Sequence, residues 1–186
     1  MPLNIANMMT LIRMLSVPFF ISSIVYYHLD ADYLRYVALG IFLLAICTDV
    51  IDGYVARAYH QKTKIGAILD PLADKFLLMS AFICLYHVQE ITAAIEVPLW
   101  ILLIVISRDA ILLIAGAGIY LTRGSIDVAP SRIGRATAFF QVVSIVAVLL
   151  HLPFFPWLWF VVGVLSLASG LDYLRAGIKV LNASSH

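Results

Sequence analysis

The chain has 186 residues, of which 63% are hydrophobic and 12% charged, and its formal net charge is +1. A soluble domain is nearer half apolar and a quarter charged, so this composition, with a mean hydropathy of +1.00, excludes an ordinary soluble protein and indicates an integral membrane protein. The length suits one domain, residues 1–186, with room for about six spans of roughly 20 residues each. The nearly balanced charge gives no sign of a nucleic-acid partner, and we expect none.

The predicted fold is all-α, with six transmembrane helices and an N-terminal interfacial helix. The mixed polar and apolar start of the chain predicts this short interfacial helix, or a helix start before the first span proper, and Pro18 would kink or separate the two parts. The predicted segments are about 4–27, 33–59, 65–87, 99–121, 131–150 and 157–174, the last with a helical tail to about residue 181.

Two further features bear on processing and redox chemistry. The N-terminus has no basic region followed by a short apolar run and a small-residue cleavage site, so no cleaved signal peptide is expected. Cys47 and Cys84 lie in apolar runs without metal-binding or redox spacing. We interpret both as small buried apolar residues.

Lys and Arg residues orient the predicted spans, because short cytoplasmic loops carry an excess of them. One predicted side holds only Arg35, accompanied by four acidic residues, and the other side holds nine basic residues. We therefore expect both termini to be cytoplasmic. The nine are Arg13, Arg57, Lys62, Lys64, Arg123, Arg132, Arg135, Arg175 and Lys179.

Four carboxylates lie inside the second and third predicted spans, Asp49 and Asp52 in one and Asp70 and Asp74 in the other. Each pair is spaced to share one helix face, and both pairs lie roughly 10–15 Å from the cytoplasmic helix ends. The sequence does not indicate a basic partner for each of the four acids. Like charges this close raise one another's pKa, and hard divalent cations relieve the repulsion because they prefer oxygen ligands. Two such ions bridged by carboxylates form a clamp for phosphoryl chemistry.

Glycines and a cation accompany these acids. Gly53 follows Asp52 directly, and Gly66 lies one turn before Asp70. Each glycine has two interpretations: it lets two helices pack closely, or it leaves room for a ligand to approach the backbone. Arg57 has two interpretations as well: it anchors the helix at the cytoplasmic surface, or its guanidinium binds a diphosphate.

The spacing Asp49-x2-Asp52-Gly53-x2-Ala56-Arg57-x8-Gly66-x3-Asp70-x3-Asp74 resembles the signature of the CDP-alcohol phosphotransferase family at all eight positions. Asn7-x2-Thr10-x2-Arg13 is similar to the N-terminal motif of the family, and the six-helix layout also fits.

The resemblance implies a CDP-linked lipid donor, above all CDP-diacylglycerol, with CMP as the leaving group and a homodimer as the assembly. It also implies two divalent cations, Mg²⁺ or Mn²⁺, and phospholipid biosynthesis as the process. The implied metal ligands are Asp49, Asp52, Asp70 and Asp74, of which Asp74 would also be the general base. The implied CDP-binding residues are Gly53, Ala56, Arg57, Gly66 and Thr10.

The acceptor alcohol depends on the fourth and fifth predicted helices. Arg108, Arg132 and Arg135 together suggest an anion pocket, although Arg108 could instead pair with Asp109, and the other two could be cytoplasmic anchors. Within the family, phosphatidylglycerophosphate synthases are similar around Asp70 to Lys75, whereas Ser107-Arg108-Asp109 is more similar to CMP-releasing cardiolipin synthases. Both glycerol 3-phosphate and phosphatidylglycerol therefore stay open as acceptors, with inositol phosphate less expected.

A cation transporter or channel is the alternative, because such proteins also place acids in membrane helices. It would not need glycine, alanine and arginine at these intervals. It would also favour acids near the midplane between repeat halves, and we find no internal repeat.

Overall fold

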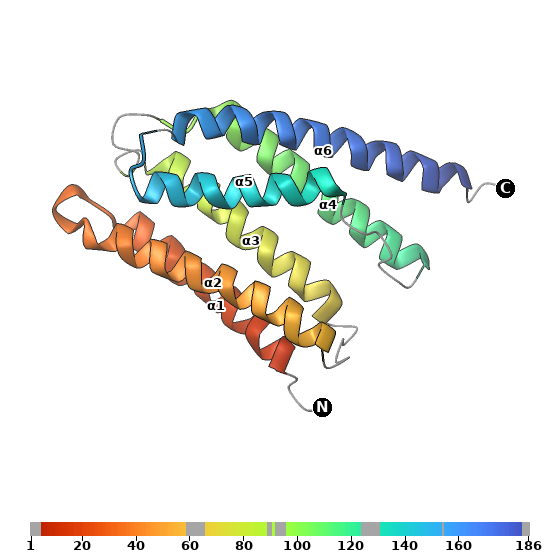
Figure 1. Cartoon of the computed structure of the whole chain (residues 1–186), viewed down its shortest axis with the longest axis horizontal. Coiled ribbons are helices and arrows are strands. Elements are labelled where there is room, and N and C mark those ends of the chain that lie inside the picture. The colour runs from red at the N-terminus through yellow and green to blue at the C-terminus, as the bar shows by residue number, and fades with distance from the viewer. Residues whose placement is uncertain are drawn as a thin grey trace. The chain divides into compact units, whose positions relative to one another are not determined.

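The computed structural model describes residues 5–58, 66–88, 91, 96–123, 131–153 and 155–183. These residues form six α-helices and one short 3-10 helix (Figure 1). The α-helices are α1 (Ile5–Val25), α2 (Tyr33–Ala58), α3 (Gly66–His87), α4 (Leu99–Arg123), α5 (Arg132–Leu149) and α6 (Phe155–Ala183). The 3-10 helix, η1 (Leu29–Ala31), lies in the predicted first loop. The described part of the chain is therefore all-helical, as predicted.

The first helix matches one of the two predicted alternatives. α1 runs without interruption from Ile5 to Val25, and Pro18 lies inside it. Pro18 therefore does not separate two helices here, which fits a helix start that continues into the first apolar stretch, and the interfacial helix stays a prediction. Pro18 has no backbone N–H, so it cannot donate the helical hydrogen bond to the carbonyl of Met14. The carbonyl oxygen of Pro18 itself accepts a hydrogen bond from Ser22 Oγ, at 2.8 Å.

Membrane-helix character is clearest in the second half of the chain. Among the described residues, three helical windows are long and apolar enough to cross a bilayer: Leu99–Gly116, Arg132–Leu149 and Pro156–Tyr173. α1 contains a shorter apolar stretch, Thr10–Val25. α2 and α3 have the length of a span but carry the acidic signature. The chain is an integral membrane protein, and the count of six spans stays a prediction.

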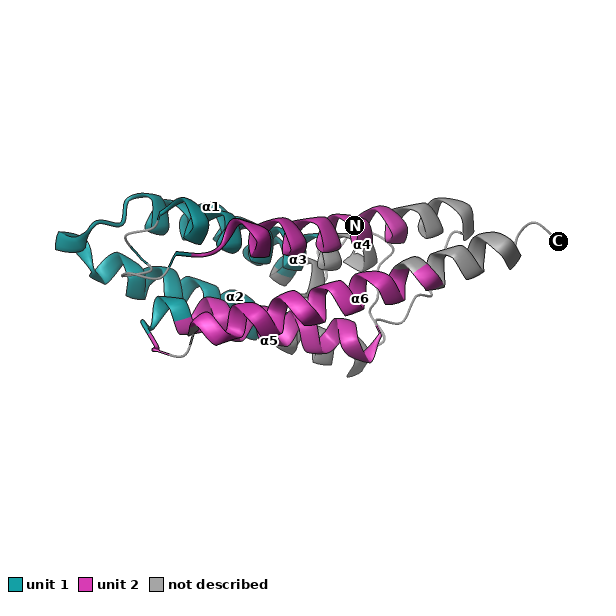
Figure 2. Cartoon of the chain, turned by 90° about the horizontal axis from the view of Figure 1, so that it is seen from above, with its two compact units in different colours: residues 1–96, 148–151 teal, residues 97–147, 152–186 magenta. Residues whose placement is uncertain are grey.

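The chain divides into two compact units, which are coloured separately in Figure 2. Unit 1 comprises residues 1–96 with 148–151, and unit 2 comprises residues 97–147 with 152–186. In unit 1, α1 packs against both α2 and α3. Its core includes Phe20 of α1 and Phe42 of α2, whose ring centroids lie 5.7 Å apart. In unit 2, α4 packs against α6.

A polar network closes unit 1 at the loop between α1 and α2. Arg35 is buried, and its Nε and Nη2 donate hydrogen bonds to the two carboxylate oxygens of Asp32, at 2.8 and 2.9 Å. Its Nη1 donates to the carbonyl oxygen of Leu149 at 2.7 Å. The Arg35 guanidinium holds the pKa of the Asp32 carboxyl below its ordinary value, chiefly through these hydrogen bonds.

The two cysteines have different surroundings. Cys84 is buried in α3, as predicted, but Cys47 in α2 is exposed, so the prediction for Cys47 was wrong. The physical reason is that an apolar side chain on a membrane helix can face lipid as well as the protein interior. Several large apolar side chains are exposed in the same way: Phe19, Leu44, Leu103, Ile114, Phe139, Phe160 and Val164.

Candidate active site

Two of the four signature acids lie on described helices at similar distances from the helix ends. Asp49 comes nine residues before Ala58, the last residue of α2, and Asp74 comes eight residues after Gly66, the first residue of α3. At 1.5 Å per residue, each acid lies about 12–14 Å along its helix from that end. Both side chains are partly buried. The helix bounds therefore agree with the depth that the sequence predicts for both acids.

Asp49 has a basic partner that spacing did not reveal. Arg13 Nη1 lies 2.6 Å from Asp49 Oδ1, and the side chain of Arg13 is 1% exposed whereas that of Asp49 is 44% exposed. α1 supplies this arginine because it packs against both acid-bearing helices. The expectation that the acids lack basic partners was therefore wrong for Asp49. The signal was present in Asn7-x2-Thr10-x2-Arg13, which places an arginine about 12 Å into the first helix.

Thr10 lies one helical turn before Arg13 and is buried, with 1% exposure. Residues three apart share a helix face, so Thr10 and Arg13 belong to the same buried face of α1. The structure thus places the N-terminal motif inside unit 1, together with Asp49 and Asp74. The predicted contact of Thr10 with a CDP group stays a prediction.

Six predicted site residues have side chains outside the described part of the structure. Their backbones belong to α2 or α3, so they occupy helices as predicted. They are Asp52, Gly53, Ala56, Arg57, Gly66 and Asp70.

Two of these six are predicted metal ligands, so the four-acid cluster stays a prediction. Among the described residues, no group of three histidine, cysteine, aspartate or glutamate side chains gathers as a metal site. The donor chemistry still suits a hard divalent cation. The Asp49 side chain is 44% exposed, and Asp74 places a second carboxylate at a similar distance along its own helix.

Arg108 in α4 is held by three partners within unit 2. It is 4% exposed and Asp109 is fully buried, and Arg108 Nη1 lies 2.5 Å from Asp109 Oδ1. Ser169 Oγ of α6 accepts from Arg108 Nη2 at 3.0 Å and from Nε at 3.3 Å. Nη2 also donates to the carbonyl oxygen of Gly134, at 3.3 Å, in α5. The pairing with Asp109 that the sequence left open is therefore present, and Ser169 and Gly134 are partners that sequence spacing did not indicate.

Arg132 and Arg135 differ from Arg108 because both are exposed, in the first turn of α5. Exposed arginines keep their guanidinium groups available for an anionic ligand. All three arginines belong to unit 2, whereas the described acids of the signature belong to unit 1. The prediction that these arginines face the acids therefore stays a prediction.

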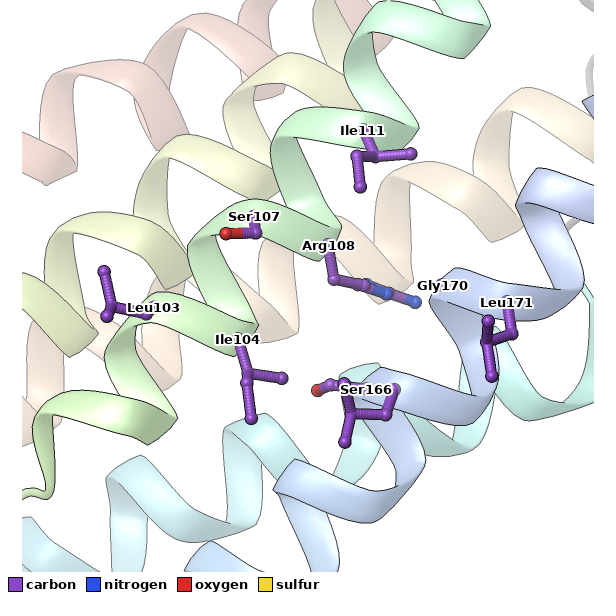
Figure 3. Close-up of a pocket in the computed structure, with 9 residues that line it drawn as sticks. Leu103, Ile104, Ser107, Arg108, Ile111, Ser166, Gly170 and Leu171 are labelled. Atoms are coloured by element: carbon purple, nitrogen blue, oxygen red, sulfur yellow. The ribbon is translucent and has the colours of Figure 1, made fainter.

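A cavity of about 290 Å³ lies between α4 and α6 in unit 2. Figure 3 shows the Arg108 side chain extending from α4 toward α6, where Gly170 lies. The Ser166 hydroxyl is fully buried in this cavity wall and has no hydrogen-bond partner among the described residues. The lining residues are Leu103, Ile104, Ser107, Arg108, Ile111, Ser166, Leu167, Gly170 and Leu171.

Comparison with known proteins gives a consistent result. The family model described as CDP-alcohol phosphatidyltransferase matches residues 3–171. The chain is 32% identical over 154 residues to the CDP-diacylglycerol--glycerol-3-phosphate 3-phosphatidyltransferase of Bacillus subtilis (strain 168), covering 78% of this chain and 75% of that protein. It is 34% identical over 186 residues to the protein of the same name from Escherichia coli (strain K12), covering 95% of this chain and 96% of that protein.

A third relative matches over a shorter region. The probable phosphatidylglycerophosphate synthase of Mycobacterium tuberculosis (strain ATCC 25618 / H37Rv) is 37% identical over 106 residues. That match covers 57% of this chain and 48% of the relative, about half its length.

Proposed function

Because the chain belongs to the CDP-alcohol phosphatidyltransferase family, we propose that it transfers the phosphatidyl group of CDP-diacylglycerol to the primary hydroxyl of glycerol 3-phosphate and releases CMP. The observation that carries this proposal is the eight-position signature from Asp49 to Asp74, which lies on α2 and α3. The names of the relatives support glycerol 3-phosphate as the acceptor. The family match identifies a transferase, so the transporter alternative loses its support.

In the proposed reaction, Asp74 is the general base. Its carboxylate takes the proton of the acceptor hydroxyl, whose oxygen forms a bond to the phosphorus that carries diacylglycerol. The bond from that phosphorus to the bridging oxygen breaks, and the oxygen leaves on CMP. Asp49, Asp52, Asp70 and Asp74 would hold two Mg²⁺ or Mn²⁺ ions, which when bound supply positive charge to the diphosphate.

Arg13 and the remaining signature residues organise the donor side in this proposal. Arg13 would fix the carboxylate of Asp49 through their ion pair, while 44% of the Asp49 side chain is exposed. The residues proposed to hold the CDP group are Thr10, Gly53, Ala56, Arg57 and Gly66. A glycine lets a ligand approach the helix backbone, and the planar fork of arginine matches a phosphate.

On the acceptor side we assign Arg108, Arg132 and Arg135. A phosphate monoester carries nearly two negative charges and favours several cations. Phosphatidylglycerol is the second candidate acceptor, favoured by Ser107-Arg108-Asp109 and by Gly134-Arg135-Ala136-Thr137, in which Arg135 is the single cation. The buried Arg108–Asp109 pair also favours a less charged acceptor, because Asp109 neutralises Arg108.

The proposed setting is the cytoplasmic half of a membrane, crossed six times, with both termini on the cytoplasmic side. Acyl chains of the donor lipid would enter from the bilayer, and the polar acceptor would enter from the cytoplasm. The homodimer implied by the family resemblance belongs to this proposal.

An acceptor panel tests the function. Purified protein in detergent is supplied with CDP-diacylglycerol, Mg²⁺ or Mn²⁺, and in turn glycerol 3-phosphate, phosphatidylglycerol or inositol phosphate, and released CMP and lipid product are quantified. We expect CMP release with glycerol 3-phosphate and its loss when the divalent cations are chelated. CMP release with phosphatidylglycerol alone would select the second acceptor, and no release with any acceptor would refute the proposed reaction.

A further inference from the structure

We propose that Asp109, Ser169 and Gly134 position the Arg108 guanidinium so that it offers the acceptor one directed hydrogen bond rather than an uncompensated charge. This inference rests on the proposed function, in which Arg108 contacts the acceptor. It assigns positioning roles to three residues that lie on three different stretches of the chain, in α4, α6 and α5.

The hydrogen bonds leave Arg108 with a single donor to offer. A guanidinium has five N–H groups in a fixed planar fork. The Ser169 hydroxyl accepts from Nε and Nη2, Gly134 accepts from the second Nη2 hydrogen, and Asp109 accepts from Nη1. One Nη1 hydrogen has no bond among the described residues. Arg108 can therefore give an acceptor one directed hydrogen bond, but not a bidentate clamp.

The charge of Arg108 is also largely compensated. Asp109 is fully buried beside it, so the pair presents almost no net charge to a ligand. A buried ion pair costs desolvation energy, and its best-attested benefit is structural specificity. Arg132 and Arg135, which are exposed, carry the charge that attracts an anionic acceptor. Arg108 therefore orients the bound acceptor, whereas Arg132 and Arg135 attract it by their charge.

The cavity gives Arg108 a place to act. Arg108 lines it together with Ser107 and several aliphatic side chains, and Figure 3 shows its guanidinium end between α4 and α6. A guanidinium free to change its orientation would lose directed hydrogen bonding to a ligand, because four rotatable bonds separate its central carbon from the backbone. The hydrogen bonds to Ser169 and Gly134 hold the guanidinium end of the Arg108 side chain in one orientation.

The principal test is Ser169→Ala, which removes the hydroxyl that accepts from two guanidinium nitrogens. We expect KM for glycerol 3-phosphate to rise by about tenfold to 150-fold, the loss typical of a hydrogen bond to a charged group. KM for CDP-diacylglycerol and the melting temperature should stay near the native values. The matched control is Ser144→Ala, because Ser144 is fully buried too but donates only to the Phe140 carbonyl of its own helix.

A second variant disturbs Arg108 from another helix. A Cβ at Gly134 would lie 3.4 Å from Arg108 Nη2, in van der Waals contact, and 3.3 Å from the Tyr173 hydroxyl, which must give way by a few tenths of an ångström. Gly134→Ala therefore crowds the guanidinium only slightly, and we expect a smaller rise in KM for glycerol 3-phosphate than for Ser169→Ala.

The outcomes separate the two proposals. If the native protein releases no CMP, the proposed function fails. If the native protein is active and Ser169→Ala behaves like Ser144→Ala, the positioning inference fails. It fails as well if both Ser169→Ala and Gly134→Ala lower kcat or the melting temperature while KM for glycerol 3-phosphate stays native, because that pattern indicates packing alone.

Discussion

Arg13 is the residue that connects the N-terminal helix to the acidic signature. It is almost fully buried, and its Nη1 lies 2.6 Å from the Asp49 carboxylate. A buried arginine without its partner, or an acid without its arginine, leaves an uncompensated charge in a poorly solvated place. We therefore expect this pair to contribute both to the packing of α1 against α2 and to the orientation of the Asp49 carboxylate.

Replacing Arg13 tests this dependence. We expect Arg13→Met to lower the free energy of unfolding by about 1–3 kcal/mol, below the value for a fully buried pair because Asp49 is 44% exposed. CMP release should fall as well. Thermal unfolding and the CMP assay measure both effects. Ser16→Ala is the control, since Ser16 contacts only the backbone carbonyl of Arg13, and equal behaviour of the two variants would contradict the assigned role.

Asp32 predicts a pH dependence at the loop between α1 and α2. Its pKa is lowered in the folded protein, chiefly by the hydrogen bonds from Arg35, so the folded state binds this proton less readily than the unfolded state. The resulting stabilisation is complete above the unfolded pKa and is lost as pH falls through the lowered folded pKa. We expect Asp32→Asn to melt below the native protein at pH 7, and the gap to close under acid conditions below about pH 4. A gap that stays constant from pH 7 to pH 3 would argue against this assignment.

The signature acids stand out in the sequence, but the Arg13 partner of Asp49 and the Ser169 partner of Arg108 do not. Charged residues inside apolar helices stand out, and their intervals set which ones share a face. Arg13 and Asp49, or Arg108 and Ser169, come together only through packing between helices that are distant in the chain. The exposure of Cys47 was unpredictable for a related reason, since apolar residues of a membrane helix face both lipid and core.

At the scale of elements, the helix bounds follow the sequence closely, because polar loops interrupt apolar runs at each end. In α1, where the sequence left a kink or a separation open, Pro18 does not divide the helix. Packing within unit 2 depends on a small residue. Gly163 of α6 lies against α4, where an added Cβ would be 2.8 Å from a ring carbon of Trp100 and 3.2 Å from Ile101 Cδ1.

Gly163→Ala therefore tests the packing of α4 against α6. We expect a loss of about 1–3 kcal/mol in the free energy of unfolding, as for an overpacked core. Gly40→Ala in α2 is the matched control, since a Cβ there meets nothing within 4 Å. That variant should be unchanged or more stable by about 0.5–1 kcal/mol, because alanine favours a helix over glycine. Denaturant titration in detergent compares them, and equal effects of the two changes would contradict the close approach at Gly163.

For the whole molecule, the distribution of basic residues predicts the orientation in the membrane. With both termini cytoplasmic, a protease added to sealed inverted vesicles should remove an epitope fused after His186. An epitope inserted in the predicted loop from Glu90 to Glu96 should stay protected. The reverse pattern would contradict the proposed orientation and the cytoplasmic acceptor with it.

The most direct measurement of the central claim is CMP release from CDP-diacylglycerol and glycerol 3-phosphate by the native protein and by Asp74→Asn. Asn keeps the size of the side chain but cannot take the acceptor proton. We predict a fall in kcat of about 100-fold or more, with the melting temperature near native. Asp30→Asn, in η1 outside the signature, should keep native activity. Native rates of CMP release by Asp74→Asn would contradict the account.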